Sequence, residues 1–317
     1  MDILSAGLMV SDIIVHPVDR GIFNVDTQFI ENIAYASGGD ALNVAVNLSS
    51  LGVNTGVAGV IGNDAPGNHI LSFLKKTGIN YDNVVKSKKY QTSVSVVLCE
   101  ESGEHHFLYY GKSNDEFNES MIPDKVLSQI KILNVGSVMA LSGLDGNGLA
   151  DLFRRAKKHD VITTLDAAHD VHGKWLFKVE KALQYADVFI PSYAEAKMIT
   201  GYEQPEKMAD FMKQYKLKIF GVKLGVQGCY ITDFNDSGGI NIPAFECDEV
   251  VDTTGAGDAF MAGFISGLLA GFKYIDCTLL GNAASNFCIR HYGASGWLPD
   301  FKTLKEFAFA GKTTLFS

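Results

Sequence analysis

The sequence predicts an α/β fold in which helices cover both faces of a mainly parallel sheet, with a small second β-sheet beside it. From residue 131 onward, short apolar runs alternate with segments of helical periodicity, as parallel sheets require. Two earlier stretches, 12–36 and 90–112, alternate polar and apolar residues and indicate half-solvated strands. The composition, 47% hydrophobic and 20% charged, is typical of a globular protein.

The first third of the chain mixes both kinds of segment. Apolar runs predict buried strands, and apolar residues at helical spacing predict helices that Gly52 and Gly78 end. The predicted elements are a strand at 3–10, an antiparallel ribbon at 12–35, a helix at 41–51, a strand at 55–61, a helix at 66–76 and a hairpin that joins 93–99 to 106–110 through a turn at 100–103.

The rest of the chain alternates strands and helices. Strands are predicted at 132–135, 161–165, 188–190 and 219–223, and helices at 144–158, 193–200 and 205–215. A β-prone segment at 249–251 then leads into a long helix that ends near Leu269. We therefore expect one domain over residues 1–317, with a lid formed by about 12–36 and 90–112.

Charge and cysteine usage exclude several classes of protein. The net charge is −9, with no block of basic residues, so a nucleic-acid partner is not expected. The five cysteines are scattered without a C-x-x-C pair, which argues against a disulfide framework or a zinc site. The N-terminus lacks the basic start of a signal peptide, and the longest apolar stretch, 259–272, is shorter than the roughly 18 residues of a membrane span. We expect a soluble cytoplasmic protein with no membrane partner.

The strongest signal for chemistry is D-T-T-G-A-G-D-A-F, from Asp252 to Phe260. Gly-Ala-Gly at a helix start presents several backbone amides, and the helix dipole adds positive potential for an anion there. Asp258 falls in the first turn, where it would repel a phosphate unless it accepts the proton of an attacking hydroxyl. The structural alternative is a tight turn with an acid at a helix N-terminus. Asp252 and Thr254 weaken that alternative because their oxygens could hold a cation.

A second glycine-rich segment runs from Ser37 to Ala45, S-G-G-D-A-L-N-V-A. Two glycines again lead into a helix, with Asp40 and Asn43 in its first turn. Such a pair supplies both acceptors and donors for a diol. The alternative is that Asp40 caps the helix, which is a common use of aspartate.

Together these segments resemble the two signatures of the ribokinase-like, or PfkB, carbohydrate kinases. The first signature, G-G-x-x-x-N-x-A followed by L-G, matches 38–45 and 51–52, and the second, D-T-x-G-A-G-D-x-F, matches 252–260. Lys223-Leu224-Gly225 with Gly228 resembles the nucleotide-contacting loop of the family, and 290–294 its C-terminal segment. The resemblance covers nearly the whole chain and implies the ribokinase-like doubly wound fold with a β-sheet lid.

The resemblance also implies ATP and Mg²⁺ as cofactors, a sugar as substrate, and a role for each matching residue. Asp258 would be the catalytic base, and the amides of Gly255, Ala256 and Gly257 would form an anion hole. The sugar would contact Asp12, Gly38, Gly39 and Asn43, with Asp40 an addition specific to this chain and Asn114, after the hairpin, a further candidate. ATP would contact Lys223, Gly225, Gly228, Asn282 and Asn286. Glu195 would organise Mg²⁺ through water, Asp252 and Thr254 would hold K⁺, and the lid would form a homodimer.

Two positions depart from the pattern or stand outside it. The N-x-x-E segment of the family appears as Ser192-Tyr193-Ala194-Glu195, so a serine hydroxyl replaces the amide. Asp166 ends a predicted strand that faces the phosphate region, and a plain strand-end role is the alternative. His105 and His106 lack an expected third ligand, so a metal role is not predicted for them.

The neighbourhood of the first signature favours a neutral substrate. Members of the family that act on phosphorylated sugars tend to carry basic residues where this chain has Asp40 and Val46. The sequence therefore predicts transfer of the ATP γ-phosphoryl group to a primary hydroxyl of a neutral sugar, of the ketohexose or pentose type. A nucleoside kinase of the same fold, a phosphosugar or sugar-acid kinase, and a non-catalytic sugar-binding regulator remain alternatives. Lys112 or Arg20 on the lid could supply a cation for an anionic sugar.

Overall fold

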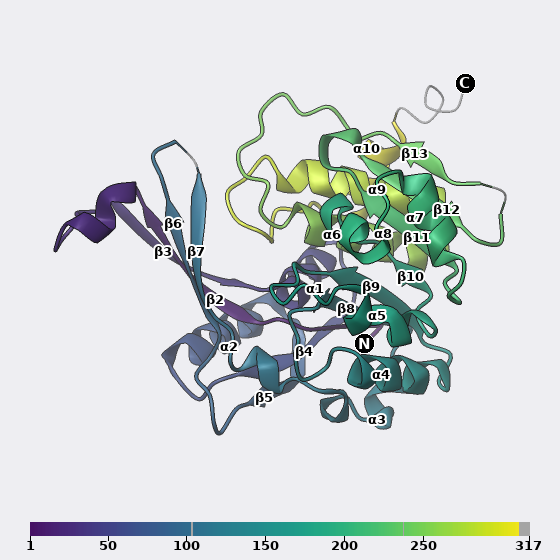
Figure 1. Cartoon of the computed structure of the whole chain (residues 1–317), viewed down its shortest axis with the longest axis horizontal. Coiled ribbons are helices and arrows are strands. Elements are labelled where there is room, and N and C mark those ends of the chain that lie inside the picture. Colours follow the sequence, from purple (N-terminus) through teal and green to yellow (C-terminus); the bar gives the residue numbers. More distant parts are fainter. Residues whose placement is uncertain (103, 237, 311–317) are drawn as a thin grey trace.

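A computed structural model describes residues 1–102, 104–236 and 238–310. Within them the chain forms a large sheet and a separate small sheet that projects from one side of the body (Figure 1). The strand order of the large sheet is β13 (Ile240–Ile242), β12 (Cys229–Asp233), β11 (Ile219–Lys223), β10 (Val188–Phe189), β9 (Ile162–Ala167), β8 (Ile132–Val138), β1 (Ile3–Ala6), β4 (Thr55–Ile61) and β5 (Asn80–Lys86).

The large sheet is parallel except where β12 pairs with β11 and β13. Helices pack on both faces and bury two main apolar clusters, so the predicted doubly wound α/β fold is confirmed. One cluster involves α1 (Asp40–Ser50), α8 (Ala256–Leu269), α9 (Tyr274–Cys288) and α10 (Phe301–Phe309), and the other α3 (Asp124–Leu127), α4 (Asn147–Lys157), α5 (Leu176–Leu183), α6 (Tyr193–Thr200) and α7 (Pro205–Met212).

A smaller third cluster joins α1 to α2 (Ala65–Thr77) and β4. Helix α2 starts where Asp64 accepts a hydrogen bond from the Gly67 amide, and it ends at Gly78, which has a positive φ of 71°. Both ends follow ordinary capping chemistry. Among the described residues, no helix has both the length and the hydropathy to cross a bilayer.

The small sheet, here called the lid sheet, has the order β3 (Asn32–Gly38), β2 (Val10–His16), β6 (Val94–Cys99) and β7 (His105–Tyr110). The predicted ribbon and hairpin are both antiparallel, and β2 joins them by parallel pairing with β6. A short helical turn, η1 (Arg20–Asn24), lies between β2 and β3. Gly103, in the predicted hairpin turn, lies outside the described residues.

Most predicted elements have the observed type, but two predictions were wrong. The predicted strand 3–10 is divided, because the chain leaves the large sheet after Ala6 and enters the lid sheet at Val10. Gly7 sits at this crossing, where a Cβ would lie 2.7 Å from the Gly136 carbonyl oxygen. The segment 249–251 is not a strand. The amides of Val251 and Asp252 instead donate to the Ile289 carbonyl at the end of α9.

Several observed elements were not predicted: β5, α5, β12, β13, α9 and α10. Helix α9 shows why. Its residues from Cys277 to Ala284 are all buried, so the apolar residues do not recur at the 3.6-residue spacing that marks an amphipathic helix.

Candidate active site

The N-terminus of α8 forms the centre of the candidate site. Gly255 precedes it with a φ of 76°, and a Cβ there would lie 2.3 Å from the Ala294 carbonyl oxygen. Only glycine fits such a position. A Cβ on Gly257 would lie 3.3 Å from Lys223 Nζ, so the ammonium group lies beside the predicted anion hole. The Ala256 amide donates to the Thr253 carbonyl at 3.2 Å, a turn bond that an anion would compete with.

The two glycine-rich segments meet at Asp258. Helices α1 and α8 pack together, and Asn43 Nδ2 donates to Asp258 Oδ2 over 2.8 Å. Asp258 is only 8% exposed. Burial raises the pKa of Asp258 well above its ordinary value, and the nearby charge of Asp40 raises it further, although the hydrogen bond from Asn43 opposes the shift. A carboxylate with such a high proton affinity suits a general base.

A buried ion pair interacts electrostatically with Asp258. Lys223, at the end of β11, donates through Nζ to Asp166, at the end of β9. Burial opposes the charge of Lys223, but the carboxylates of Asp166 and Glu195 outweigh it and raise the Lys223 pKa. Burial raises the pKa of Asp166 to about 6, against the effect of Lys223. The predicted candidates Asp166 and Glu195 are therefore both within electrostatic reach of the lysine.

Ser192 fills the position of the missing asparagine as a helix cap. Its hydroxyl accepts a hydrogen bond from the Glu195 amide at 3.4 Å, and its own amide donates to Glu195 Oε2 at 2.8 Å. This reciprocal capping box fixes the start of α6 and the orientation of Glu195. The serine cap thus holds the Glu195 carboxylate in place, and one oxygen of that carboxylate accepts a hydrogen bond from the Ser192 amide.

The sugar-binding candidates converge on the start of α1 from the lid sheet and the body. Gly39 has a φ of 93°, and a Cβ there would lie 2.4 Å from the Leu8 carbonyl oxygen. A Cβ on Gly38 would lie 2.2 Å from Asp12 Oδ2, so Asp12 on β2 folds over that glycine. Burial raises the pKa of Asp12 to about 6. Asp40 accepts a hydrogen bond from the Ser137 hydroxyl, a partner that the sequence analysis missed.

Asn114 is inaccessible and holds neighbouring segments together. It is fully buried, with Oδ1 accepting from the Met9 amide and Nδ2 donating to the Met9 carbonyl and the Tyr109 hydroxyl, each at 3.1–3.2 Å. The predicted direct contact between Asn114 and sugar therefore lacks a free surface, and its amide tethers Tyr109 of the lid sheet to the body.

A cavity of about 470 Å³ opens beside the α8 N-terminus. All five predicted nucleotide residues line it, together with Ala256 and Gly257 of the anion hole. Asn282 and Asn286, one turn apart on α9, do more than line the wall. Their amide groups donate to carbonyls at 242–243 and 245–246, which hold the loop between β13 and α8 over the cavity.

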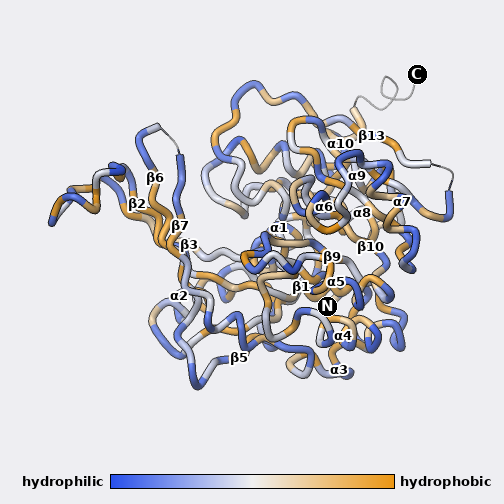
Figure 2. Tube along the Cα trace, viewed as in Figure 1, coloured by the Kyte–Doolittle hydropathy of each residue, from blue (hydrophilic) through white to orange (hydrophobic). Residues whose placement is uncertain are grey.

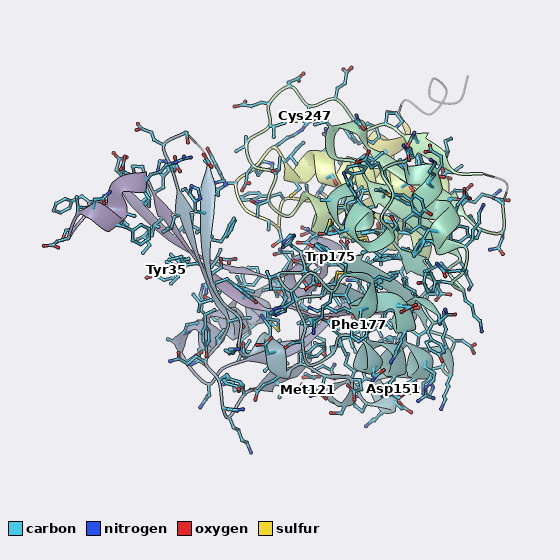
Figure 3. All side chains as sticks on the ribbon, viewed as in Figure 1. Tyr35, Met121, Asp151, Trp175, Phe177 and Cys247 are labelled. Atoms are coloured by element: carbon cyan, nitrogen blue, oxygen red, sulfur yellow. The ribbon has the colours of Figure 1, made fainter. Side chains whose placement is uncertain are left out.

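That loop also carries cavity residues that sequence reasoning missed: Phe245, Glu246, Cys247 and Val250. Figure 3 labels Cys247 on this loop, on the side of the body from which the lid sheet projects. No motif marks the segment, because its position depends on the two asparagines of a helix about 40 residues later in the chain.

The two candidate cation residues are tied into a turn. Asp252 Oδ1 accepts from the Thr254 amide at 2.9 Å, and Oδ2 accepts from the Gly293 amide at 3.0 Å. Burial opposes the charge of Asp252, yet the hydrogen bonds from Thr254 lower its pKa overall. The carboxylate thus joins the signature loop to the 290–294 segment. A cation at this position stays a prediction.

One expectation about the lid was wrong. His106 does have neighbouring ligand-type groups, because Glu100 Oε1 lies 2.6 Å from its Nε2 and Glu104 completes a cluster. Arg20 already pairs with both carboxylates, at 2.7 Å for Glu100. The guanidinium therefore occupies the place that a metal ion would need, and we assign no metal to this cluster.

A buried carboxylate, Asp258, and the ammonium group of Lys223 thus lie at the α8 N-terminus, next to a cavity of about 470 Å³. The chain matches the pfkB family carbohydrate kinase model over residues 2–300, and it belongs to that family. It is therefore an ATP-dependent sugar kinase with the ribokinase fold.

Two curated relatives are similar to the chain in sequence, and one solved structure is similar to it in fold. The ATP-dependent 6-phosphofructokinase of Thermoanaerobacterium thermosaccharolyticum is 29% identical, over 96% of this chain and 93% of that protein. The 2-dehydro-3-deoxygluconokinase of Bacillus subtilis is 28% identical over 86% of each. Arabidopsis thaliana ribokinase, solved with ribose and ATP, has a TM-score of 0.82 at 22% identity, over 97% of this chain and 98% of that chain.

Proposed function

We propose that the enzyme transfers the γ-phosphoryl group of ATP to a primary hydroxyl of a neutral sugar, of the ketohexose or pentose type. The observation that carries the proposal is the position of Asp258. It is buried at the α8 N-terminus, oriented by Asn43 and close to both Asp40 on the sugar side and Lys223 on the phosphate side. A sugar hydroxyl between these groups would contact both Asp258, as the base, and the γ-phosphate of ATP, as the phosphoryl donor.

In the proposed reaction, Asp258 takes the proton of the sugar hydroxyl, and the hydroxyl oxygen forms a bond to the γ-phosphorus. The bond from that phosphorus to the β–γ bridging oxygen breaks, and ADP leaves with the electron pair. Lys223 and the amides at 255–257 stabilise charge on the transferring group. Asp166 and Glu195 offer the carboxylate oxygens that Mg²⁺ prefers, and the ion would neutralise phosphate charge from there.

Charge supports a neutral substrate over an anionic one. Asp12 and Asp40 lie on the sugar side of Asp258, and Val46 is buried. The two cations that the lid could supply both have carboxylate partners, Arg20 with Glu100 and Glu104, and Lys112 with Asp115 at 3.4 Å. The names of the two curated relatives make the phosphosugar or sugar-acid kinase the second candidate, since both names denote anionic acceptors.

A coupled ADP-release assay tests the proposal against neutral sugars, sugar phosphates, sugar acids and nucleosides. We expect a neutral sugar to give the highest kcat/KM, and Asp258→Asn to lower its kcat by roughly 10²–10⁴-fold because the base is lost. Asp187→Asn, which changes a buried carboxylate that pairs with Lys157 and Lys218 outside the candidate site, is the control and should keep the wild-type kcat. Preference for fructose 6-phosphate or a keto-deoxy sugar acid would overturn the substrate class, and full activity of Asp258→Asn would overturn the base.

We also propose a homodimer through the lid sheet. The strand register places seven apolar residues on the face opposite to Asp12, here called the outer lid face: Ile13, Val15, Ile33, Tyr35, Val96, Leu98 and Leu108. Tyr35, Leu108 and Ile33 are each more than half exposed. A cavity of about 270 Å³ lies beside Leu98 and Leu108 and could receive an apolar side chain of a second copy. Two-fold pairing would bury this face against itself.

Two smaller proposals concern the cellular location of the enzyme and its dependence on monovalent cations. The five cysteines are free thiols, and ATP is a cytoplasmic substrate, which together support a cytoplasmic location. A monovalent cation beside Asp252 and Thr254 would make turnover higher in KCl than in equal NaCl, and equal rates in both salts would contradict it.

A further inference from the structure

The end of β8 has an unusual backbone next to the sugar side of the site. Ser137 and Met139 have positive φ angles of 61° and 86°, although neither is glycine. Both are buried, and the pairing of β8 with β9 shifts register between Val135 and Val138. Side chains rarely adopt such angles, and strain of this kind persists only where surrounding groups enforce it.

The irregularity orients one functional group. It turns the Ser137 side chain toward α1, where the hydroxyl donates to Asp40 Oδ2. Bulges next to active sites often re-aim a side chain in this way. The contact is close on all sides, because a Cβ on Gly136 would lie 3.0 Å from the Asp40 Cβ. The orientation of the Asp40 carboxylate thus depends on the backbone of the β8 end.

Pairing with β9 holds Val138, whose carbonyl accepts from the Ala168 amide at 2.9 Å, but side chains hold Met139 just beyond it. The Met139 amide donates to Asp145 Oδ1 at 2.9 Å, and the Met139 carbonyl accepts from Lys178 Nζ of α5. Lys178 Nζ also lies 3.4 Å from Asp145 Oδ2 and 3.1 Å from Asp170 Oδ1. The amide and the carbonyl of Met139 therefore both form hydrogen bonds with one cluster of charged side chains.

The cluster is nearly inaccessible to water. The side chains of Asp145, Lys178 and Asp170 are 6%, 11% and 0% exposed. The second carboxylate oxygen of Asp170 accepts from the amides of Lys174 and Trp175, which anchors the loop after β9. Figure 3 labels Trp175 near the middle of the body. Buried ions of this kind are poor contributors to stability when hydrophobic residues could replace them, so their presence calls for another role.

We propose that Asp145, Lys178 and Asp170 form a clamp that positions Ser137, and through it Asp40, for sugar binding. The clamp residues are positioning residues, since none of them contacts the substrate. The proposal rests on the proposed role of Asp40 as a sugar ligand. It predicts that loosening the clamp weakens sugar binding and leaves the nucleotide cavity, on the other side of α8, unaffected.

A double-mutant cycle with the neutral sugar that gives the highest turnover tests the clamp. Asp145→Ala and Ser137→Ala are each expected to raise the sugar KM about 10–150-fold, the range of one lost hydrogen bond to a charged group, with the ATP KM unchanged. The double variant should bind sugar no worse than Ser137→Ala alone, because both changes remove the same contact. Asp145→Asn, which keeps an acceptor for Met139, should give a smaller rise.

Asp187→Ala is the matched control. Asp187 is also a buried aspartate that pairs with lysines and accepts a backbone amide, from Thr163 at 2.8 Å. It lies just before β10, at the end of the parallel strands opposite to the end of β8. It should lower the melting temperature without changing the sugar KM. Additive effects of Asp145→Ala and Ser137→Ala, or a rise in KM for ATP as well, would overturn the clamp.

Two further measurements keep the test decisive. If Asp145→Ala does not fold, the cycle is run with Asp145→Asn, and an unchanged sugar KM in that folded variant overturns the proposal. If no sugar is turned over by the wild type, the proposed function fails, and a crystal structure of Asp145→Asn then tests the clamp alone. Displacement of the Ser137 hydroxyl from Asp40 supports it, and an unchanged contact contradicts it.

Discussion

At the scale of single residues, the site is governed by carboxylates that share one small volume. Asp258, Asp40 and Asp166 act on one another electrostatically, with Lys223 as their common cation. Burial raises the pKa of Asp40 as well, and the hydrogen bond from Ser137 opposes that rise. In the proposed reaction Asp40 would therefore have two effects: it would accept hydrogen bonds from sugar hydroxyls, and its charge would raise the pKa of the base, Asp258.

The second effect gives a prediction about pH. Asp258 must be ionised to accept a proton, so kcat/KM falls as pH falls through its pKa. Because the charge of Asp40 raises that pKa, Asp40→Asn should move the acidic limb of the kcat/KM profile to lower pH. The pH profile of both enzymes with the same sugar measures the shift.

Asp187→Asn is the control, because Asp187 is a buried carboxylate outside the candidate site and, against the effect of burial, its pKa is lowered, chiefly by Lys157 and Thr163. It is expected to leave the midpoint of the limb in place. An acidic limb that stays fixed in Asp40→Asn, or moves to higher pH, would show that the two carboxylates are not coupled in the working enzyme.

At the scale of elements, two helix N-termini form the centre of the candidate site, and one loop covers the cavity beside it. Helices α1 and α8 each begin after a glycine with positive φ, and their first turns bring Asn43 to Asp258. Helix α9 contributes differently, since its asparagines hold the loop over the cavity. Local sequence explains where α1 and α8 begin, whereas the loop is fixed by a helix that follows it.

Asn286→Ala should therefore raise the KM for ATP by up to about 30-fold with little change in the KM for sugar. The substitution removes donors to the Phe245 and Glu246 carbonyls, each worth about 1 kcal/mol, and lets the loop move away from the cavity. Asn118→Ala is the matched control, because Asn118 makes similar local bonds in a short turn away from the cavity. Equal KM values for ATP in Asn286→Ala and the wild type would show that the loop does not contribute to nucleotide binding.

At the scale of the whole molecule, the body and the projecting lid sheet differ in how they bury apolar residues. The body encloses its clusters between helices and strands, while Figure 2 shows apolar residues along the projecting strands. The inner face of the lid sheet carries Asp12 and meets the site. The outer lid face has no partner within the described residues of one chain. A sheet exposed on both faces is a poor independent unit, which favours association.

Leu108→Glu should convert the proposed dimer to a monomer. Leu108 lies in one row with Tyr35, Ile13 and Val96 across the outer lid face, and a carboxylate buried there on both copies would be unpaired. Light scattering after size-exclusion chromatography measures the mass. Val171→Glu, at an 80% exposed apolar residue of the body, is the control and should keep the wild-type mass. A wild-type mass of one chain would contradict the proposed dimer directly.

The sequence by itself determined the fold class and the family, and it predicted the residues of the candidate site. The two glycine-rich segments and Asp258 could be identified because a helix start with special backbone angles needs glycine locally, and local requirements remain visible in a sequence. Most helices and strands with a clear period were predicted for the same reason, including β4, α6 and β11, whose bounds matched.

Only the tertiary structure decided which groups act together. Ser137 reaches Asp40, Asn286 holds the 245–246 loop, and Asp145 with Lys178 holds Met139, in each case across different elements. The buried position of Asn114 and the pairing of Arg20 with the lid carboxylates were also invisible in the sequence. These contacts depend on how elements pack, and a hydrogen bond between residues far apart in the chain leaves no periodicity or spacing for sequence analysis to find.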